Sequence, residues 1–420
     1  MKNYIFLCLV IPALSFAQSD TLTLEHCVQI ALKHNPSIRI AEGGLESSES
    51  NLELSRSALY PQISAQAALT RNGGTIIVGN RSINGFFDNY TTGLQAQQLV
   101  FDFGKTITRV SGSADLVDAS DQNSRASTED IILNTYISYY DYLAAERVRE
   151  VDSETVQQAA DHLKQAQAFY KAGTAPQYDV VNAEVTLANA NVSLIQAENN
   201  LKITRVQLEN AIGQQLPDNF LLSDILEVSY VKIDVQAAID TALRSRPELL
   251  SSQAQVQAGK QFLASAWTAN LPSIYATGGY NWRNLNPSPL YPGWNIGVTL
   301  SLPIFQGFAL DAGIDQARAN LKTAEASNDL VIQSLLLDVQ QQEFALEEAS
   351  ESIQASRKLV EQASEALRLA VARYNSGIGT ALEETDAQVA LANARIAYIQ
   401  SLYNYSVSYA RLERAMGTIK

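Results

Sequence analysis

The chain has 420 residues, of which 46% are hydrophobic and 18% are charged, and this composition excludes intrinsic disorder. Its 44 acidic and 30 basic residues give a formal net charge of -14. A phosphate backbone would be repelled, so we expect no nucleic-acid partner. Two cysteines are too few for a disulfide framework or a structural zinc site.

Residues 1–17 have the pattern of a secretory signal peptide. Lys2 precedes an apolar stretch from Tyr4 to Leu14, and small residues at Ser15 and Ala17 precede a cleavage site at Gln18. We therefore expect export. The mature chain lacks an apolar run of about 18 residues, so any membrane contact would use strands or an interfacial surface.

An internal duplication organises the rest of the chain. Residues of the first half recur 204 positions later, as Leu187-Ala188-Asn189-Ala190 does at Leu391-Ala392-Asn393-Ala394. Further upstream the offset is 211, which relates Pro36 to Pro247. The duplication predicts a first repeat at 18–213, a connector at 214–234 and a second repeat at 235–420.

Each repeat is predicted to contain one β-hairpin, in which apolar and polar residues alternate. The expected strands are 62–70 and 92–97 in the first repeat, and 273–278 and 294–302 in the second. The change of offset falls within the first hairpin, where we expect a longer loop. No charged side chain occurs in 57–70, 261–282 or 284–310, although the flanking segments are rich in charge.

The remaining sequence is alanine-rich and predicts long coiled-coil helices. No proline interrupts 105–171 or 308–375, and apolar or small residues step by three and four along Ile353, Ser356, Val360, Ala363, Leu367, Ala370 and Tyr374. Returning helices are expected at about 175–212 and 378–416, so each repeat ends in a helical hairpin. Shorter helices are expected at about 35–58 and 246–269, leading into the strands.

Two hairpins give four strands per chain, and four strands cannot close a membrane barrel, which needs roughly eight. Open sheet edges are not tolerated in hydrocarbon, so a membrane location requires several chains. Aromatic residues lie toward the strand ends, as expected at membrane interfaces, at Tyr60, Tyr90, Tyr280, Trp282, Tyr291 and Trp294. The alternative is a sheet packed against helices, with these aromatics in its core.

Several motifs, in duplicated order, resemble the TolC-like outer-membrane efflux proteins. They are Leu22-Thr23-Leu24-Glu25 through Asn35-Pro36, the junctions 99–104 and 302–307, and the turns Tyr170-Lys171-Ala172-Gly173 and Tyr374-Asn375-Ser376-Gly377. The resemblance covers essentially the whole mature chain. It implies a homotrimer in the outer membrane, with a 12-stranded barrel continuous with a 12-helix periplasmic tunnel. It also implies an exit duct of tripartite efflux or type I secretion, partnered by a periplasmic adaptor and an inner-membrane pump.

Acidic residues cluster just past the second helical turn, at Glu383, Glu384 and Asp386, and Asp179 occupies the slot of Glu383 in the first repeat. In the family, acids at positions like Glu383 and Asp386 ring the periplasmic mouth of the tunnel. Alternatively, they form a solvated helix N-terminus, where the helix dipole favours acids. The resemblance also implies a latch of a tyrosine, an acid and a basic residue at this constriction. Tyr374 and Asp179 fit that latch, but Gly379 stands where the basic residue would be.

The turns at Gly173-Thr174 and Gly377-Ile378 are predicted to need glycine, because a residue with positive φ commonly ends a helix. The resemblance implies that these tips contact the adaptor protein.

No enzymatic motif or cofactor site is predicted. The chain lacks a phosphate-binding glycine loop and a nucleophile elbow, and its histidines, His26, His34 and His162, are scattered. The alternative to a channel is a periplasmic coiled-coil adaptor or scaffold that never inserts into the membrane.

Overall fold

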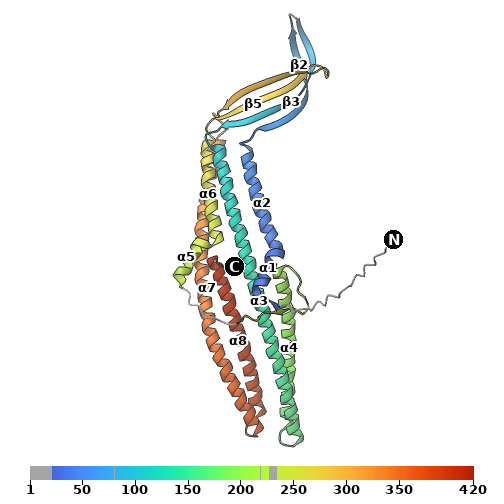
Figure 1. Cartoon of the computed structure of the whole chain (residues 1–420), viewed down its shortest axis with the longest axis vertical. Helices are drawn as coiled ribbons and strands as arrows, with labels where there is room; N and C mark the ends of the chain where they lie inside the picture. The colour runs from blue at the N-terminus through green and yellow to red at the C-terminus, as the bar shows by residue number, and fades with distance from the viewer. Residues whose placement is uncertain (1–20, 80, 218, 227–233) are drawn as a thin grey trace, which may run out of the picture. The chain divides into compact units, whose positions relative to one another are not determined.

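The computed structural model describes residues 21–79, 81–217, 219–226 and 234–420 (Figure 1). The predicted signal peptide, and residues 218 and 227–233 of the predicted connector, lie outside the described residues.

Every helix of the first half has a counterpart of equal length in the second half. The pairs have 11, 22, 67 and 36 residues, and they are α1 (Leu24–His34) with α5 (Val235–Ser245), α2 (Pro36–Ser57) with α6 (Pro247–Thr268), α3 (Lys105–Lys171) with α7 (Ala309–Asn375), and α4 (Gln177–Ile212) with α8 (Ala381–Met416). The predicted long helices are thus present. None of the helices within the described ranges combines the length and apolar character needed to cross a membrane.

The four long strands form one antiparallel sheet in the order β2-β3-β5-β6. Their bounds are β2 (Gln62–Val78), β3 (Arg81–Phe101), β5 (Ser273–Asn284) and β6 (Tyr291–Ser301). Strands β2 and β6 are the edges, and no pairing joins them within the described part of the chain. One chain therefore leaves two edges of this sheet open.

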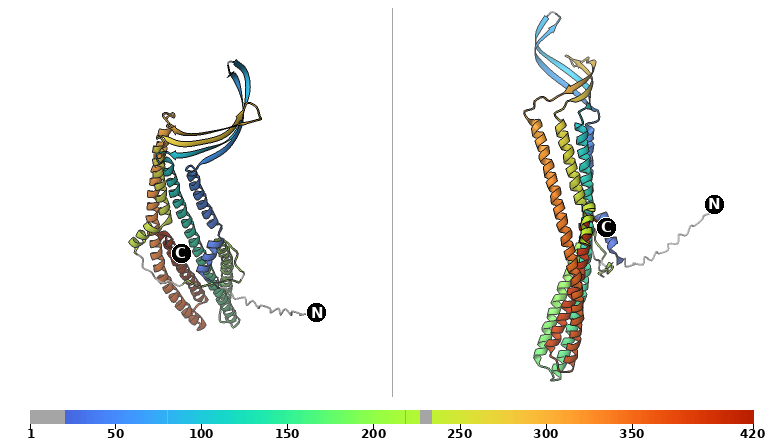
Figure 2. Two further views of the ribbon diagram at one scale, coloured as in Figure 1. Left: turned by 45° about the horizontal axis from the view of Figure 1, so that its top comes forward. Right: turned by 90° about the vertical axis from the view of Figure 1, so that its left-hand side faces the viewer.

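The first hairpin is longer than predicted, and the prediction of a longer loop is wrong. Strand β2 ends at Val78 and β3 begins at Arg81, whereas six residues separate β5 from β6. The additional residues of the first repeat lie in its strands, which pair with each other beyond the last β3–β5 pair, Tyr90 with Asn284. Figure 2 shows this two-stranded extension beyond the four-stranded part of the sheet.

A second, two-stranded sheet was not predicted. Strand β1 (Thr21–Leu22) pairs in parallel with β4 (Leu221–Leu222), so the start of the described chain meets the predicted connector. The hydroxyl of the fully buried Tyr139, on α3, lies 3.1 Å from the Leu22 carbonyl oxygen and 2.7 Å from that of Ser223. These bonds fasten both short strands to the long helix.

The chain divides into two compact units, and each unit draws on both repeats. The first unit comprises Met1–Pro36, Ile131–Lys232 and Gln342–Leu412, and contains α1, α4, most of α8 and the C-terminal parts of α3 and α7. The second unit comprises Ser37–Asp130, Ile233–Gln341 and Glu413–Lys420, and contains the large sheet, α2, α5, α6 and the N-terminal parts of α3 and α7. The compact units therefore do not coincide with the sequence repeats.

In the first unit, α7 and α8 pack as the predicted seam requires. Ile353, Ser356, Ala363, Ala370 and Tyr374 are buried, while Val360 and Leu367 pack against the cluster of Ala363 with Leu391 and Ala394. Small side chains in this seam allow the two helices to approach closely, and a 2.8 Å bond joins the hydroxyls of Ser356 and Ser401.

In the second unit, a charged cluster centres on Arg414, whose side chain is 7% exposed. Its guanidinium lies 3.2 Å from Glu129, 2.8 Å from Asp130 and 2.5 Å from Glu248. Burial alone would raise the pKa of Glu248, but its hydrogen bond and attraction to Arg414 outweigh burial, so the pKa is lowered. Because the Arg414 guanidinium is buried among carboxylates, we assign this charged cluster a structural role in holding the helices of the second unit together.

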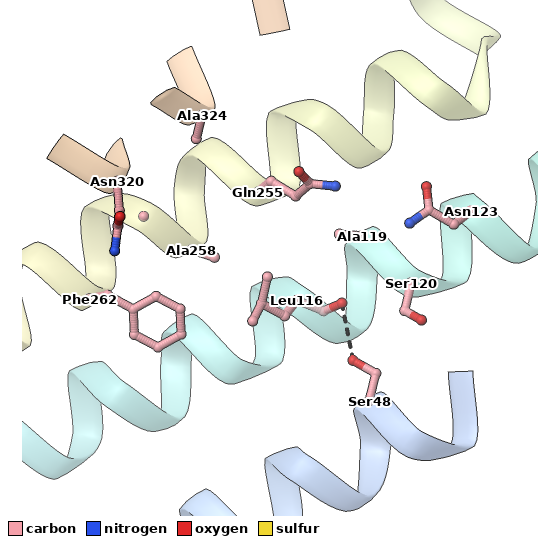
Figure 3. Close-up of a pocket in the computed structure, with 11 residues that line it drawn as sticks. Ser48, Leu116, Ala119, Ser120, Asn123, Gln255, Ala258, Phe262, Asn320 and Ala324 are labelled. Atoms are coloured by element: carbon pink, nitrogen blue, oxygen red, sulfur yellow. Dashed lines mark hydrogen bonds between the residues drawn. The ribbon is translucent and has the colours of Figure 1, made fainter. Parts of the chain in front are cut away.

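A cavity of about 430 Å³ lies in the second unit, between α2, α3, α6 and α7 (Figure 3). Its wall is formed by small, amide and apolar side chains, and Ser48 donates a 3.2 Å hydrogen bond to the Leu116 carbonyl oxygen beside it. None of its lining residues is titratable. We therefore assign this cavity to helix packing.

Candidate functional site

The two helical turns of the first unit have the same backbone geometry. Gly173 and Gly377 both have φ of 75°, in the left-handed region that favours glycine. The amide of Thr174 donates to the Phe169 carbonyl oxygen at 3.0 Å, and the amide of Ile378 donates to that of Arg373 at 3.1 Å. The predicted structural need for glycine is confirmed at both turns.

The tips of these turns present side chains to the outside of the chain. Thr174 is exposed, and Ile378 is 71% exposed. An apolar side chain this exposed at a helical turn is available to a partner, whereas the backbone around it is fixed by the turn hydrogen bonds.

The predicted acidic residues are placed differently from one another. Glu383 is exposed in the first turn of α8 and lies 3.3 Å from the Arg373 guanidinium. Asp386 is also exposed, whereas Asp179, in the first turn of α4, is half-buried. The structure therefore brings these acids to the starts of two returning helices, and Glu383 already has a basic neighbour.

Tyr374 is buried at the end of α7, where its ring lies 5.4 Å from the His162 ring and 5.5 Å from the Phe169 ring. Burial, together with the negative charges of Asp179 and Glu384, raises the pKa of its phenol. The phenol therefore stays neutral at physiological pH. The latch of Tyr374 and Asp179 that the resemblance implies stays a prediction.

Gly379 cannot be replaced by a basic residue without disturbing the turn. A Cβ there would lie 2.9 Å from Arg373 Cβ and 3.0 Å from the Tyr374 nitrogen. The basic side chain at this turn is instead Arg373, which contacts Glu383 and reaches the Ile378 carbonyl oxygen at 3.5 Å.

Sequence reasoning missed the role of two residues, His162 and Glu384. His162 Nδ1 lies 3.1 Å from Glu384 Oε1, and the two side chains are 1% and 4% exposed. The available signal was the helical seam, because His162 lies between the buried Ala159 and Ala166, with spacings of three and four. Glu384 likewise lies between the buried Ala381 and Gln388.

A groove of about 430 Å³ runs between α3, α4 and α8 in the same unit. Val185, Leu382, Val389 and Ile396 supply apolar wall, and Asp386 and the buried Asp152 supply carboxylates. Burial raises the pKa of Asp152. In the described segments, no group of three or more His, Cys, Asp or Glu side chains is arranged to hold a metal ion.

Comparison with known protein families identifies the class to which the chain belongs. The family described as "Outer membrane efflux protein" matches residues 27–214 and 238–418. This chain belongs to that family. The two matched segments contain both helical hairpins and the whole four-stranded sheet.

Curated relatives match over nearly the full chain. The probable efflux pump outer membrane protein TtgC of Pseudomonas putida is 24% identical over 402 residues, which is 94% of this chain and 82% of the relative. The outer membrane protein TolC of Escherichia coli is 24% identical over 426 residues, which is 96% of this chain and 84% of TolC.

Solved structures show the same fold. The CmeC outer membrane channel of Campylobacter jejuni superposes with a TM-score of 0.84 at 20% identity, covering 94% of this chain and 85% of CmeC. The open state of the MtrE outer membrane channel of Neisseria gonorrhoeae superposes with a TM-score of 0.82 at 21% identity, covering 94% and 89% of the two chains.

The predictions of an outer-membrane efflux function and of an outer-membrane location that extends into the periplasm are thereby confirmed. The family is one of transport conduits, so the match decides against the alternative of a periplasmic adaptor or scaffold.

Proposed function

We propose that three copies of this chain form a passive exit duct through the outer membrane, serving a tripartite efflux or type I secretion system. Family membership combined with a four-stranded sheet open at both edges carries this proposal. Unpaired backbone groups at β2 and β6 cannot face hydrocarbon, and pairing of β6 with β2 of the next copy satisfies both edges. Three copies then give twelve strands.

The sheet supports this assignment through its exposed apolar face. Along β6, Trp294, Ile296, Val298 and Leu300 are 74%, 82%, 75% and 63% exposed. Their spacing of two places them on one face of the strand, while Asn295, Gly297 and Thr299 alternate with them on the other. A continuous apolar ridge of this kind suits lipid outside a barrel, with the polar face lining water.

We propose that Asp179, Glu383, Asp386 and Tyr374 form the constriction at the periplasmic mouth. Threefold repetition would concentrate the carboxylates around one axis, so that the local potential favours cations over anions. The exposure of Glu383 and Asp386 in the single chain supports such a ring, in which the 3.3 Å contact with Arg373 offsets part of the charge of Glu383.

Planar-bilayer recording of the purified protein tests the duct and its mouth together. The wild-type protein should conduct with preference for cations, and neutralisation by Glu383→Gln with Asp386→Asn should lower that preference. Glu361→Gln, on an exposed position of α7, serves as the control because it changes one charge away from the turn. Absence of any conductance would contradict the duct, and unchanged selectivity in the double variant would contradict the ring.

We further propose that the turns Gly173-Thr174 and Gly377-Ile378 contact a periplasmic adaptor, which links the duct to an inner-membrane pump. The exposed tips and their fixed backbone support this role. A cysteine at Thr174 or Ile378 should crosslink to the adaptor in intact cells, and a cysteine at Gln255 of α6 should not. Failure of both turn positions to form an adduct would count against the contact.

A further inference from the structure

Beside the second helical turn, three helices bring a group of polar side chains together in a closed interior. His162 comes from α3, Tyr374 from α7, and Glu384 and Thr385 from α8, and all four residues are less than one-tenth exposed. The burial is complete within one chain, so it does not depend on assembly. All of these residues belong to the first compact unit.

The hydrogen-bonding capacity of this cluster is only partly used. Both ring nitrogens of His162, Glu384 Oε2, the Tyr374 hydroxyl and Thr385 Oγ1 are buried and make no hydrogen bond within the chain. Glu384 Oε1 lies 3.1 Å from His162 Nδ1 and accepts a 3.4 Å bond from the Gln388 amide. Because unmet polar groups in an apolar interior are costly, the charge state of this cluster affects how tightly the helices pack.

Other charged groups around the cluster are engaged elsewhere or have the same sign as Glu384. Asp179, from α4, is negative, and on α7 Arg373 is paired with Glu383 at the surface. On α3, Asp161 and Lys164 pair with each other at 2.9 Å and are exposed. Among the described residues around Glu384, His162 is therefore the group able to supply a compensating positive charge.

Protonation of the imidazole changes this interaction strongly. An imidazolium forms a charge-assisted hydrogen bond with the carboxylate, whereas a neutral imidazole leaves the buried negative charge uncompensated. Histidine is the side chain whose charge ordinarily changes between about pH 5 and pH 8. The attraction between α3 and the start of α8 is accordingly strong when His162 is protonated and weak when it is neutral.

We propose that His162 and Glu384 form a proton-dependent clasp, which holds the α7–α8 turn against α3 when His162 is protonated and loosens when it is neutral. The second turn alone has this device. In the first repeat the position equivalent to Glu384 is Val180, and in the second repeat the position equivalent to His162 is Ala366. Under the proposed function, which this inference extends, the clasp closes the mouth in acid by restraining one of the two hairpins.

Hydrogen–deuterium exchange of the full-length protein in detergent tests the clasp directly. After correction for intrinsic exchange, peptides spanning 374–388 should be more protected at about pH 6 than at about pH 8. In His162→Gln this difference should be lost, with protection at both pH values matching the wild-type protein at the higher pH. Peptides from α6 should show no pH-dependent difference in either protein.

Two further variants complete the test. Glu384→Gln should lose the same difference, which provides the answer if His162→Gln fails to fold, and Asp161→Asn, next to His162 but exposed, should retain it. A wild-type protein without the pH dependence, or a dependence that persists in His162→Gln and Glu384→Gln, would overturn the clasp. Protein that shows the protection change but never conducts would leave the clasp intact and contradict the proposed duct.

Discussion

The two repeats agree in every helix length and differ at both ends of their helical hairpins. At the sheet end, the strands of the first repeat have 17 and 21 residues, and those of the second have 12 and 11. At the turn end, the second repeat has Gly379, Arg373 and Glu384, whereas Ala175, Phe169 and Val180 occupy the equivalent positions of the first. The helices of the two repeats thus match in length, whereas the lengths of their strands and the residues of their turns differ.

The charged cluster around Arg414 should show the largest difference between the repeats in the stability lost on substitution. Arg414→Ala leaves the buried Glu129 without its cation and leaves Glu248 with Arg246 alone, so we expect a loss of about 3–5 kcal/mol in the free energy of unfolding. The equivalent residue of the first repeat is the exposed Asn210, and Asn210→Ala should change stability by less than about 0.5 kcal/mol. Denaturant unfolding followed by circular dichroism measures both. Equal losses in the free energy of unfolding would contradict the structural role assigned to the buried Arg414.

The second turn should tolerate a methyl group less well than the first. Gly379→Ala forces Cβ against Arg373 and should destabilise the turn by about 1–3 kcal/mol. Ala175→Gly, at the equivalent position, adds only conformational freedom and should cost about 1 kcal/mol or less. Exchange protection of peptides spanning each turn reports the local effect. A Gly379→Ala protein with unchanged protection would show that the turn relaxes around the new side chain.

The turn glycines should behave alike, because their backbone geometry is the same. Gly173→Ala and Gly377→Ala each place a side chain at φ of 75° in open space, so strain of about 1–2 kcal/mol is expected at both. Unfolding of the two variants side by side gives the comparison. If the two losses of unfolding free energy differ by more than about 2 kcal/mol, one turn is held by a further interaction. The clasp beside the second turn is the first candidate for that interaction.

The smallest effect is expected at the exposed pair Arg395 with Glu154, which joins α8 to α3 at 2.6 Å. Its side chains are 37% and 61% exposed, so Arg395→Ala should cost no more than about 1 kcal/mol, and less at high salt. Unfolding at low and high ionic strength measures this. A loss as large as that for Arg414→Ala would contradict the view that burial decides the strength of these contacts.

Periodicity in the sequence was sufficient to predict the helices and their packing faces. The steps of three and four from Ile353 to Tyr374 identify the buried seam of α7, and Gly173 and Gly377 mark the turns correctly. The length of the first hairpin was harder to predict. The change of offset between the repeats suggested a longer loop, but the additional residues extend β2 and β3, where Arg71 and Asp88 face each other at 2.7 Å.

The clasp residues show a different limit of sequence reasoning. His162 and Glu384 each occupy a seam position that the heptad pattern could reveal, yet they are 222 residues apart. Their contact depends on the register between α3 and α8, which follows from tertiary packing and has no signature in either helix alone. The acidic cluster around Glu383 could be recognised because its members are neighbours in the sequence, whereas the two clasp residues are not.

The two open edges of the sheet are proposed to pair between copies of the chain, and cysteine crosslinking of these edges in isolated outer membranes measures that pairing. A cysteine at Ala65 of β2 is combined with single cysteines scanned along β6 from Trp294 to Leu300, and the membranes are oxidised and analysed under denaturing conditions. We predict that at least one combination gives a ladder ending at three covalently joined chains. The absence of adducts across the scan, or a ladder ending at another number, would contradict the trimeric duct.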